Sequence, residues 1–280
     1  MSERTIVITG ASDGIGAAAA RVFTRFGEKV VVVGRSAEKT KRIADELGAE
    51  HFVSDFAELA QVRELAAALK EKYPRIDVLA NNAGGIMGER QLTVDGHEKT
   101  FQVNHLAPFL LTNLLMDTLV QSKARVINTS SVANVIFARF DIDDLDAERK
   151  YSPNKAYGDS KLANILFTKE LHRRFASEGI TTAAFHPGGV ATNFSADSTS
   201  PMRHAYNSVL RRLMLTPEQG ADTLLWLATA EPFKDWIPGE YYAKRKVARA
   251  NKVASNPEIA RQLWERSEDM VKEQLDPTLG

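Results

Sequence analysis

Thr5-Ile6-Val7-Ile8-Thr9-Gly10-Ala11-Ser12-Asp13-Gly14-Ile15-Gly16 is the stretch that decides the fold. Its first five residues are all β-branched, as expected of a parallel strand buried on both faces. Gly10, Gly14 and Gly16 then lie between this strand and an alanine-rich helix that we expect to end near Phe26. Such glycines let the backbone approach a pyrophosphate at the helix N-terminus. The turn therefore predicts nucleotide binding, with a purely structural turn as the alternative, since its spacing is not the commoner G-x-G-x-x-G.

The rest of the chain alternates short apolar strands with helices. Further strands are expected at 29–33, 51–55, 76–80, 125–129, 180–185 and 240–242. Helices are expected at 37–47, 58–72, 96–121, from Pro153 past Lys161, at 218–230 and at 257–274. This pattern predicts an α/β fold, a single-domain Rossmann-type doubly wound parallel sheet with helices on both faces. Ligands of such sheets bind outside the carboxyl ends of the strands.

One domain is expected to include all residues from 1 to 280. Within it, residues 191–216 are expected to form a substrate lid, and residues 246–280 a C-terminal helical extension. The helix at 96–121 has to tolerate Pro108, and the acidic stretch 134–151 is expected to be irregular.

Charge and composition exclude several classes of function. The chain has 36 basic and 36 acidic side chains and no net charge, so nothing indicates a nucleic-acid partner. It has no cysteine, and its six histidines show no metal-ligand spacing, so we expect no disulfide and no metal. No signal peptide precedes the first strand, and no apolar run is long enough to span a bilayer. We therefore expect a cytoplasmic protein without a membrane anchor.

The end of the second strand bears on the choice of nucleotide. An acidic residue about 20 positions after the glycines would bind the ribose 2′-hydroxyl of NAD. This chain has Arg35 there, followed by Ser36 and Lys39. A guanidinium binds a 2′-phosphate well, so NADP(H) is favoured over NAD(H), although Asp13 in the glycine turn argues mildly against a nearby phosphate. A solvated arginine at a strand end is the alternative.

Polar or small residues also follow the next three strands. Asp55 follows the third, where its carboxylate either accepts a hydrogen bond from adenine or caps the next helix. Asn81-Asn82-Ala83-Gly84 closes the fourth strand, and Ser130-Ser131 closes the fifth. All these motifs fall at the carboxyl ends of strands, which is where such sheets bind ligands.

Tyr157 and Lys161 lie four residues apart, on one face of the predicted helix that follows the fifth strand. A lysine ammonium beside a phenol favours the phenolate and lowers the tyrosine pKa. This makes Tyr157 a candidate proton donor and acceptor near neutral pH. Taken alone, such a pair is more often two helix-surface residues with no role.

Together these motifs resemble the short-chain dehydrogenase/reductase family. The resemblance is carried, in the family's order, by Thr9-Gly10-x-x-x-Gly14-x-Gly16, Asn81-Asn82-Ala83-Gly84, Asn104, Ser131, Tyr157-x-x-x-Lys161 and Pro187-Gly188. The chain is also similar to the retinol-dehydrogenase-like branch at residues 101–106, at 161–168, in the extra residues between Ser131 and Tyr157, and at 259–264.

The resemblance implies catalytic roles for four residues. Ser131, rather than Ser130, would hydrogen-bond the substrate oxygen, and Tyr157 would contact the same oxygen and pass the proton. Lys161 would lower the pKa of Tyr157 and bind the nicotinamide ribose. Asn104 would hold a water that connects Lys161 to solvent.

The motifs and the resemblance together give the expected cofactor site. Its residues are Gly10, Ser12, Asp13, Gly14, Ile15, Gly16, Arg35, Ser36, Lys39, Asp55, Phe56, Asn82, Ala83, Gly84, Thr129, Tyr157, Lys161, Pro187, Gly188, Val190 and Thr192.

The expected function is NADP(H)-dependent hydride transfer between the nicotinamide and a carbonyl or alcohol carbon. The apolar side of the expected lid favours a lipophilic ketone, aldehyde or alcohol; its residues are Phe194, Met202, Tyr206, Val209, Leu210, Leu213 and Met214. Reduction of an activated carbon–carbon double bond is an alternative, and so is a non-catalytic NADP-binding regulator. The resemblance further implies a homodimer or homotetramer, formed through the helices beginning near Gly96 and Pro153.

Overall fold

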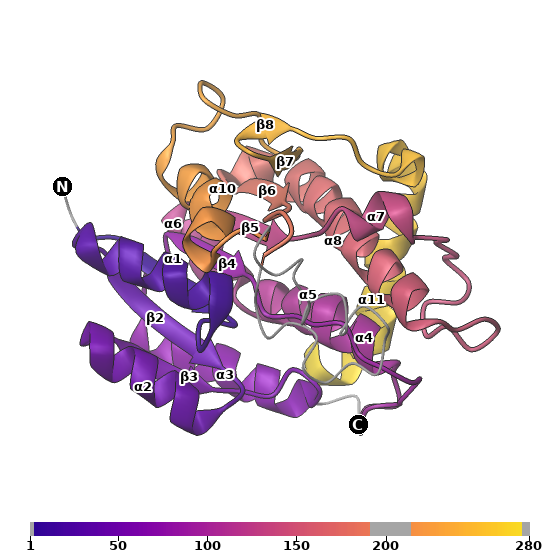
Figure 1. Ribbon diagram of the computed structural model, residues 1–280, viewed down its shortest axis with the longest axis horizontal. Helices are drawn as coiled ribbons and strands as arrows, with labels where there is room; N and C mark the ends of the chain where they lie inside the picture. Colours follow the sequence, from indigo (N-terminus) through magenta and orange to yellow (C-terminus); the bar gives the residue numbers. More distant parts are fainter. Residues whose placement is uncertain (1–2, 191–213, 276–280) are drawn as a thin grey trace.

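The computed structural model describes residues 3–190 and 214–275, and the eight strands in these ranges form one sheet (Figure 1). The sheet order is β3-β2-β1-β4-β5-β6-β7-β8. The strands are β1 (Thr5–Thr9), β2 (Lys29–Gly34), β3 (Glu50–Val53), β4 (Val78–Asn81), β5 (Arg125–Thr129), β6 (Thr181–Phe185), β7 (Tyr241–Ala243) and β8 (Lys246–Val247). All neighbours from β3 to β7 are parallel. The predicted doubly wound parallel sheet is confirmed.

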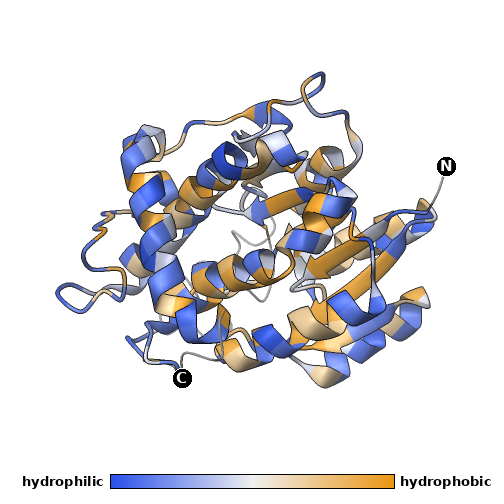
Figure 2. Ribbon diagram, turned by 180° about the vertical axis from the view of Figure 1, so that it is seen from behind, coloured by the Kyte–Doolittle hydropathy of each residue, from blue (hydrophilic) through white to orange (hydrophobic). Residues whose placement is uncertain are grey.

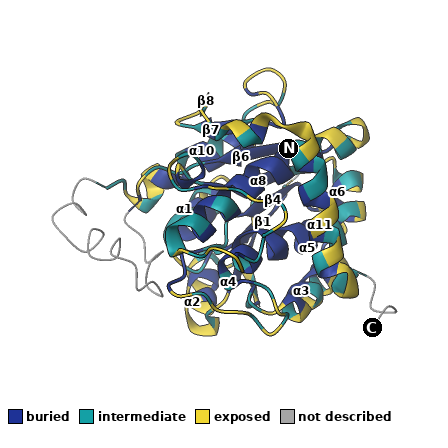
Figure 3. Ribbon diagram, turned by 90° about the vertical axis from the view of Figure 1, so that its right-hand side faces the viewer, coloured by how far each residue is buried: buried dark blue, intermediate teal, exposed yellow. Residues whose placement is uncertain are grey.

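Helices cover both faces of this sheet, and the strand pattern explains why. In β1, Ile6 and Ile8 point into one core and Val7 into the other, and all three are fully buried. The core of Ile6 and Ile8 is covered by α1 (Gly14–Arg25), α2 (Ala37–Leu47) and α10 (Pro217–Thr229). The core of Val7 is covered by α3 (Leu59–Lys72), α5 (Ala107–Leu114) and α8 (Pro153–Phe175). Apolar strands therefore lie between two helical layers whose exposed surfaces are largely polar (Figures 2 and 3).

The C-terminal helix α11 (Pro257–Leu275) adds to the second layer by packing on α8 and α5. Its Trp264 ring lies 5.0 Å from the Phe109 ring and 5.7 Å from the Phe167 ring, and the Arg174 guanidinium lies over it at 4.6 Å. Helix α11 thus covers part of α5 and α8, the helices through which we expect an oligomer to form. The oligomeric state stays a prediction.

The prediction of one continuous helix at 96–121 is wrong. The helical segment begins at Lys99 with a single turn, α4 (Lys99–Phe101), continues as a π-helix, η1 (Gln102–Leu106), and resumes as α5 and α6 (Met116–Ser122). The π-helical turn immediately precedes Pro108, which has no N–H to donate to the carbonyl of Asn104 four residues earlier. The chain therefore accommodates the proline by widening the helix at this point.

Several other boundaries differ from the predictions. Strand β3 ends at Val53, so Ser54 and Asp55 begin a loop, and β4 starts at Val78 rather than Ile76. The stretch predicted to be irregular begins near a short helix, α7 (Ala133–Ile136). Strand β8 was not predicted; it forms a hairpin with β7 across Lys244 and Arg245, which both have positive φ and lack the usual asparagine–glycine signal.

Most of the expected lid, residues 191–213, lies outside the described residues, and so does Thr192 of the expected cofactor site. Within the described ranges, no helix is long and apolar enough to cross a membrane.

Candidate active site

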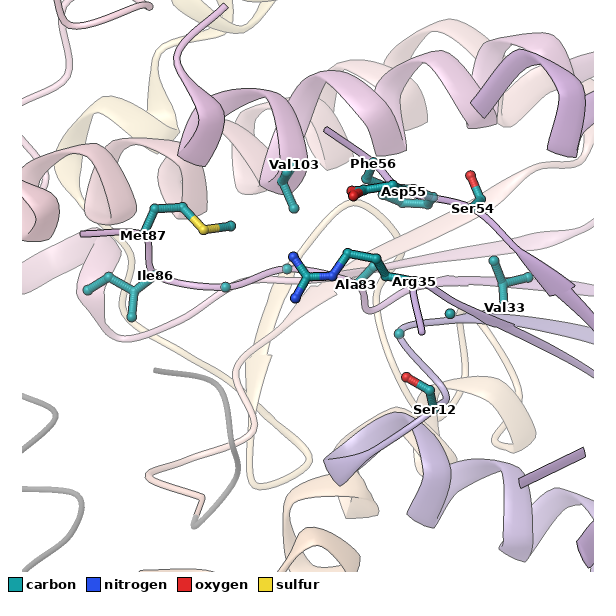
Figure 4. A pocket seen from close by; sticks show the side chains of 14 residues that line it. Ser12, Val33, Arg35, Ser54, Asp55, Phe56, Ala83, Ile86, Met87 and Val103 are labelled. Carbon is teal, nitrogen blue, oxygen red and sulfur yellow. The ribbon is translucent and has the colours of Figure 1, made fainter. Parts of the chain in front are cut away.

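A cavity of about 480 Å³ opens at the carboxyl ends of β1, β4, β5 and β6. Its lining brings together most of the predicted site: Gly10, Ser12, Asp13, Gly14, Ile15, Arg35, Lys39, Asn82, Ala83, Gly84, Thr129, Ser131, Tyr157, Lys161, Pro187, Gly188 and Val190. An adjoining pocket of about 190 Å³ shares Gly10, Ser12, Arg35, Ala83 and Gly84 with it and adds Asp55 and Phe56 (Figure 4). Together the two spaces form one elongated site along the ends of the strands.

The glycine turn has room only for hydrogen atoms at two positions. A Cβ atom on Gly16 would lie 2.4 Å from the carbonyl oxygen of Gly10, and one on Gly10 would lie 2.8 Å from the Cα atom of Ala83. Gly10 also has a φ of 66°. The turn therefore passes close under the β4 loop and exposes the N-terminus of α1 to the cavity, where backbone N–H groups can bind a phosphate.

Asp13 in this turn is the N-cap of α1, since its carboxylate accepts a hydrogen bond from the Gly14 N–H at 2.7 Å. The Lys39 ammonium lies 3.8 Å from the same carboxylate. This structural role explains an acidic residue beside a candidate phosphate site, because an N-cap carboxylate stabilises the helix and a lysine partly offsets its charge.

Arg35 and Ser36, which lie next to each other at the end of β2, have different surroundings. Arg35 extends its guanidinium into the smaller pocket (Figure 4). Ser36 lines neither pocket; instead it caps α2 by accepting a hydrogen bond from the Lys39 N–H. Arg35 and Lys39 are therefore the cations at this end of the site, and the predicted cofactor contact of Ser36 stays a prediction, because its hydroxyl can still donate a hydrogen bond while it caps the helix.

Asp55 and Phe56 line the smaller pocket beside Arg35. The Asp55 carboxylate accepts a hydrogen bond from the Ala57 N–H at 2.9 Å, as a local loop cap would. Phe56 is buried. The N-cap of α3 is Glu58, so the prediction that Asp55 caps the next helix is wrong, and its contact with adenine stays a prediction.

The loop after β4 is tied to the end of β1. The Thr9 hydroxyl accepts hydrogen bonds from the N–H groups of Asn82 and Ala83, each at 3.0 Å. The Asn82 side chain donates to the carbonyl of Thr9 at 3.0 Å and to that of Gly10 at 3.3 Å. Asn82 therefore fixes the glycine turn, and Ala83 and Gly84 form a backbone surface against which a flat ligand can lie.

The two serines after β5 have different surroundings. Ser130 is buried, and its hydroxyl donates to the carbonyl of Lys161 at 2.7 Å. The Ser131 hydroxyl accepts a hydrogen bond from the Ala133 N–H at 3.2 Å and lines the cavity. The donor of Ser130 is already used, so the geometry favours Ser131 as the serine that meets a substrate oxygen.

Tyr157 and Lys161 come from the first turns of α8, which starts at Pro153 with Ser152 as its N-cap. The Lys161 ammonium lies 5.7 Å from the centre of the Tyr157 ring and donates to the Thr129 carbonyl at 3.2 Å. Lys161 is 1% exposed, and this burial lowers its pKa from 10.5 to about 7. The Lys161 amine can therefore change its protonation state near neutral pH. When it is protonated, solvent screens the interaction of its charge with the Tyr157 phenol only weakly.

Asn104 lies in the π-helical turn η1, and its side-chain amide makes three hydrogen bonds with the protein. The amide oxygen accepts from the Gly85 N–H at 3.1 Å, and the amide nitrogen donates to the carbonyls of Gly85 and Thr100. Its amide oxygen and its backbone carbonyl each keep a lone pair that can accept from a water, so the water that we expect beside Asn104 stays a prediction.

The loop after β6 completes the cavity. Gly188 has a φ of 91°, and its N–H donates to the His186 imidazole at 3.1 Å. Val190 forms a bridge with Leu215 across the ends of the segment outside the described residues. Pro187, Gly188 and Val190 thus line the same cavity as Tyr157 and Lys161.

Some cavity residues were not predicted: Gly189, Val132, Ala133 and Phe137. The last three lie on or beside α7, and Phe137 falls in the stretch expected to be irregular. Asn164 was also missed as a site residue; it lies one turn after Lys161 and contacts the same Thr129 carbonyl. A buried amide between Ala163 and Ile165 was the available signal, because an asparagine in an apolar helix needs polar partners.

Comparison with known proteins identifies relatives along almost the whole chain. The family model described as short chain dehydrogenase matches residues 4–203. A protein of Streptomyces sp. (strain C5), provisionally named daunorubicin C-13 ketoreductase DnrU, is 42% identical over 271 residues, which are 94% of this chain and 91% of that protein. Human retinol dehydrogenase 13 is 38% identical over 288 residues, covering 96% of this chain and 84% of that protein.

Solved structures agree with these matches. A protein from Mycobacterium paratuberculosis without an assigned function superposes with a TM-score of 0.78 at 33% identity, covering 97% of this chain and 94% of that one. The NADP complex of Pseudomonas aeruginosa RhlG has a TM-score of 0.68 at 27% identity, covering 86% of this chain and 94% of that one.

Proposed function

This chain belongs to the short-chain dehydrogenase/reductase family, in its retinol-dehydrogenase-like branch, and we propose that it uses NADP(H) to reduce or oxidise a lipophilic carbonyl or alcohol. One observation carries the proposal: Tyr157 and Lys161 meet Ser131 in a single cavity that also contains the glycine turn and Arg35. This grouping supports a site in which a proton donor, a substrate oxygen and a dinucleotide come within reach of one another.

The residues present fit a bound dinucleotide. A Cβ atom on Gly10 would collide with Ala83, and one on Gly16 with the carbonyl oxygen of Gly10, so these glycines let the turn pack against the β4 loop while Gly14 and Ile15 of α1 line the cavity. The cofactor supplies or accepts the hydride at its nicotinamide ring. Around it, Asn82 fixes the glycine turn, Arg35 and Lys39 provide positive charge, and Asp55 and Phe56 line the pocket farther along.

The chain's own residues handle the proton. In the reductive direction Ser131 and Tyr157 donate hydrogen bonds to the carbonyl oxygen, and they stabilise the negative charge that develops there. Tyr157 then gives its proton to this oxygen; in the oxidative direction the phenolate takes a proton from the alcohol. The Lys161 ammonium, 5.7 Å from the Tyr157 ring, favours the phenolate and brings the tyrosine pKa toward neutrality. Proton transfer of this kind contributes about 10²–10⁴-fold.

NADP(H) is the coenzyme that the charges favour. Arg35 extends into the pocket at the end of β2, and within the described lining of the two pockets Lys39 is a second cation at that end. A 2′-phosphate can pair with a guanidinium through two parallel hydrogen bonds, whereas NAD(H) offers only a hydroxyl there. The NADP complex of the RhlG neighbour supports the same choice.

The substrate end of the cavity is apolar. Ile86, Ala133 and Tyr157 form a small buried cluster, and Phe137 packs against it. Val132 lines the same cavity and is 45% exposed. An apolar wall beside one polar reacting centre suits a lipophilic ketone, aldehyde or alcohol. The names of the two relatives, which specify ketone reduction and retinol oxidation, agree with such a substrate class.

The proposal is tested by following NADPH consumption with lipophilic ketones, aldehydes and an α,β-unsaturated ketone, and by identifying each product. Formation of alcohols from the simple carbonyl compounds supports it. Saturation of the double bond with the carbonyl left intact would instead indicate double-bond reduction, and no consumption with any compound would favour a non-catalytic NADP-binding protein.

A further inference from the structure

A buried chain of polar side chains connects Lys161 to the C-terminal helix. The Asn164 amide nitrogen donates to the Thr129 carbonyl at 3.1 Å, and Lys161 donates to the same oxygen at 3.2 Å. The Asn164 amide oxygen lies 3.4 Å from His105 Nδ1, and His105 Nε2 lies 2.9 Å from the Ser267 hydroxyl of α11. These groups belong to β5, α8, η1 and α11, which meet only in the folded chain.

The direction of each hydrogen bond in this chain follows from its partners. Asn164 uses both amide hydrogens on carbonyls, those of Thr129 and Asn104, so its oxygen can only accept. His105 is fully buried, and burial lowers its pKa to about 4, so the ring is neutral. A neutral ring carries one N–H, which must be at Nδ1 and point to Asn164. Nε2 then accepts from the Ser267 hydroxyl. The side-chain donors and acceptors of Asn164 and His105 are then all paired.

Pro108 leaves the backbone carbonyl of Asn104 without its usual helical hydrogen bond. Pro108 has no N–H to donate to the Asn104 carbonyl, as an ordinary α-helix would require. Asn164 supplies a donor at 3.0 Å from that carbonyl. One asparagine side chain therefore holds two backbone carbonyls, one beside Lys161 and one in the segment where we expect a water to connect Lys161 to solvent.

Lys161 depends on this arrangement for its position. Within the described residues, the Thr129 carbonyl is the acceptor that its ammonium group contacts. A carbonyl oxygen has two lone pairs, so it can hold both Lys161 and Asn164. When Asn164 occupies one, the direction of the other is set, and the ammonium stays at its distance of 5.7 Å from the Tyr157 ring.

We propose that Asn164 is a positioning residue for Lys161, and that His105 and Ser267 hold Asn164 in place from the C-terminal helix. The inference rests on the proposed function, in which Tyr157 accepts the proton of an alcohol. Removing Asn164 frees the Thr129 carbonyl and lets the ammonium move away from the phenol. The Tyr157 pKa then rises toward its usual value of about 10.

Other ionisable groups lie on the elements packed around this site, and the proposal leaves them unchanged. They are the Lys155–Asp159 pair of α8, Glu98 before α4, Tyr241 of β7, His186 after β6, and Asp13, Arg35 and Lys39 at the other end of the cavity.

The test compares the pH dependence of kcat for oxidation of an alcohol in wild type, N164L, H105F and S267A. N164L removes the amide at similar size, and H105F keeps an aromatic ring among Phe101, Phe109 and Phe167. We expect the acid limb of N164L to move up by about one pH unit, which is about a tenfold loss below the limb. At high pH the rate recovers. H105F and S267A shift the limb in the same direction by less.

T112V is the matched control. The Thr112 hydroxyl is as buried as this network, donates to the Pro108 carbonyl and accepts from Asn81, but contacts none of its members. T112V should leave the limb at the wild-type pH. A second readout does not require turnover: the ultraviolet titration of tyrosinate, taken as the difference between each variant and the same variant with Y157F, should show the same shift.

The outcomes separate this inference from the function on which it rests. Turnover by Y157F would contradict the proposed function itself. With Y157F inactive, superimposable profiles for N164L, H105F, S267A and wild type would overturn the positioning role. A shift of the same size in T112V would overturn it as well, since any loss of buried polar contacts would then suffice.

Discussion

Replacing Arg35 by aspartate should weaken the preference for NADP(H), because it removes one of the two cations, Arg35 and Lys39, at the end of β2. A hydrogen bond to a charged group contributes about 1.5–3 kcal/mol. Arg35 is an exposed residue at the end of β2, so solvent screens its charge and the lower part of this range applies. Its loss should therefore weaken NADPH binding by about tenfold, since about 1.4 kcal/mol corresponds to a factor of ten.

The new carboxylate acts on both coenzymes. It repels the 2′-phosphate of NADPH, which adds to the loss, and it can accept a hydrogen bond from the ribose hydroxyl of NADH. We therefore expect the ratio of the two dissociation constants to change by more than about tenfold, mainly through NADPH. The discrimination of the wild type should also decrease as salt is added, because an exposed charge is screened.

Fluorescence titration of each coenzyme measures both dissociation constants. R42D is the control, because Arg42 is exposed on α2, lines neither pocket and gives the same change in net charge. It should leave both constants near the wild-type values. An unchanged ratio in Arg35→Asp, or an equal change in R42D, would refute the assignment of Arg35 to the 2′-phosphate.

Three further predictions concern the catalytic loop, the core and the pH dependence of stability. Gly84→Ala should lower kcat by at least about tenfold, because its Cβ atom would lie 2.3 Å from Asn104 Oδ1 and 3.0 Å from Lys161 Nζ; steady-state kinetics equal to the wild type would contradict this. Trp264→Ala should lower the free energy of unfolding by about 3–5 kcal/mol in urea titrations, because the buried ring packs on Phe109 and Phe167, and a loss below about 1 kcal/mol would show that α11 does not stabilise the core. Burial depresses the pKa of His105 to about 4, so as the pH is lowered the unfolded chain binds a proton at this histidine before the folded chain does. The free energy of unfolding, measured in urea titrations, should therefore decrease as the pH is lowered from about 6.5 to 4. H105F should remove part of this decrease, and the same pH dependence in H105F and wild type would contradict the prediction.

Most of the fold was predictable from the sequence because its signals are local. The apolar run Thr5–Thr9 and the glycines after it determine one strand, one turn and one helix without reference to the rest of the chain. The break in the predicted helix at 96–121 was harder to predict from the sequence. Pro108 indicated a disturbance, but whether the chain kinks, stops or widens depends on what can donate to the Asn104 carbonyl, and that donor, Asn164, is 60 residues away.

The candidate site shows the same division. The motifs predicted that Ser131, Tyr157 and Lys161 lie together near the carboxyl ends of the strands, and in the structure all three line one cavity. The separation of Ser130 from Ser131 by hydrogen bonding, and the capping role of Ser36, depend on side-chain directions that spacing does not specify. The connection from Lys161 to Ser267 joins residues 106 positions apart, so no local pattern could have predicted it.

The turnover of Y157F with NADPH and a lipophilic ketone shows whether the hydroxyl group of Tyr157 is the proton donor of this site. We predict that turnover falls to the background rate while NADPH binds with nearly the wild-type dissociation constant, since the aromatic ring stays and only the hydroxyl group is lost. Turnover within about tenfold of the wild type would contradict Tyr157 as the acid and base of this site.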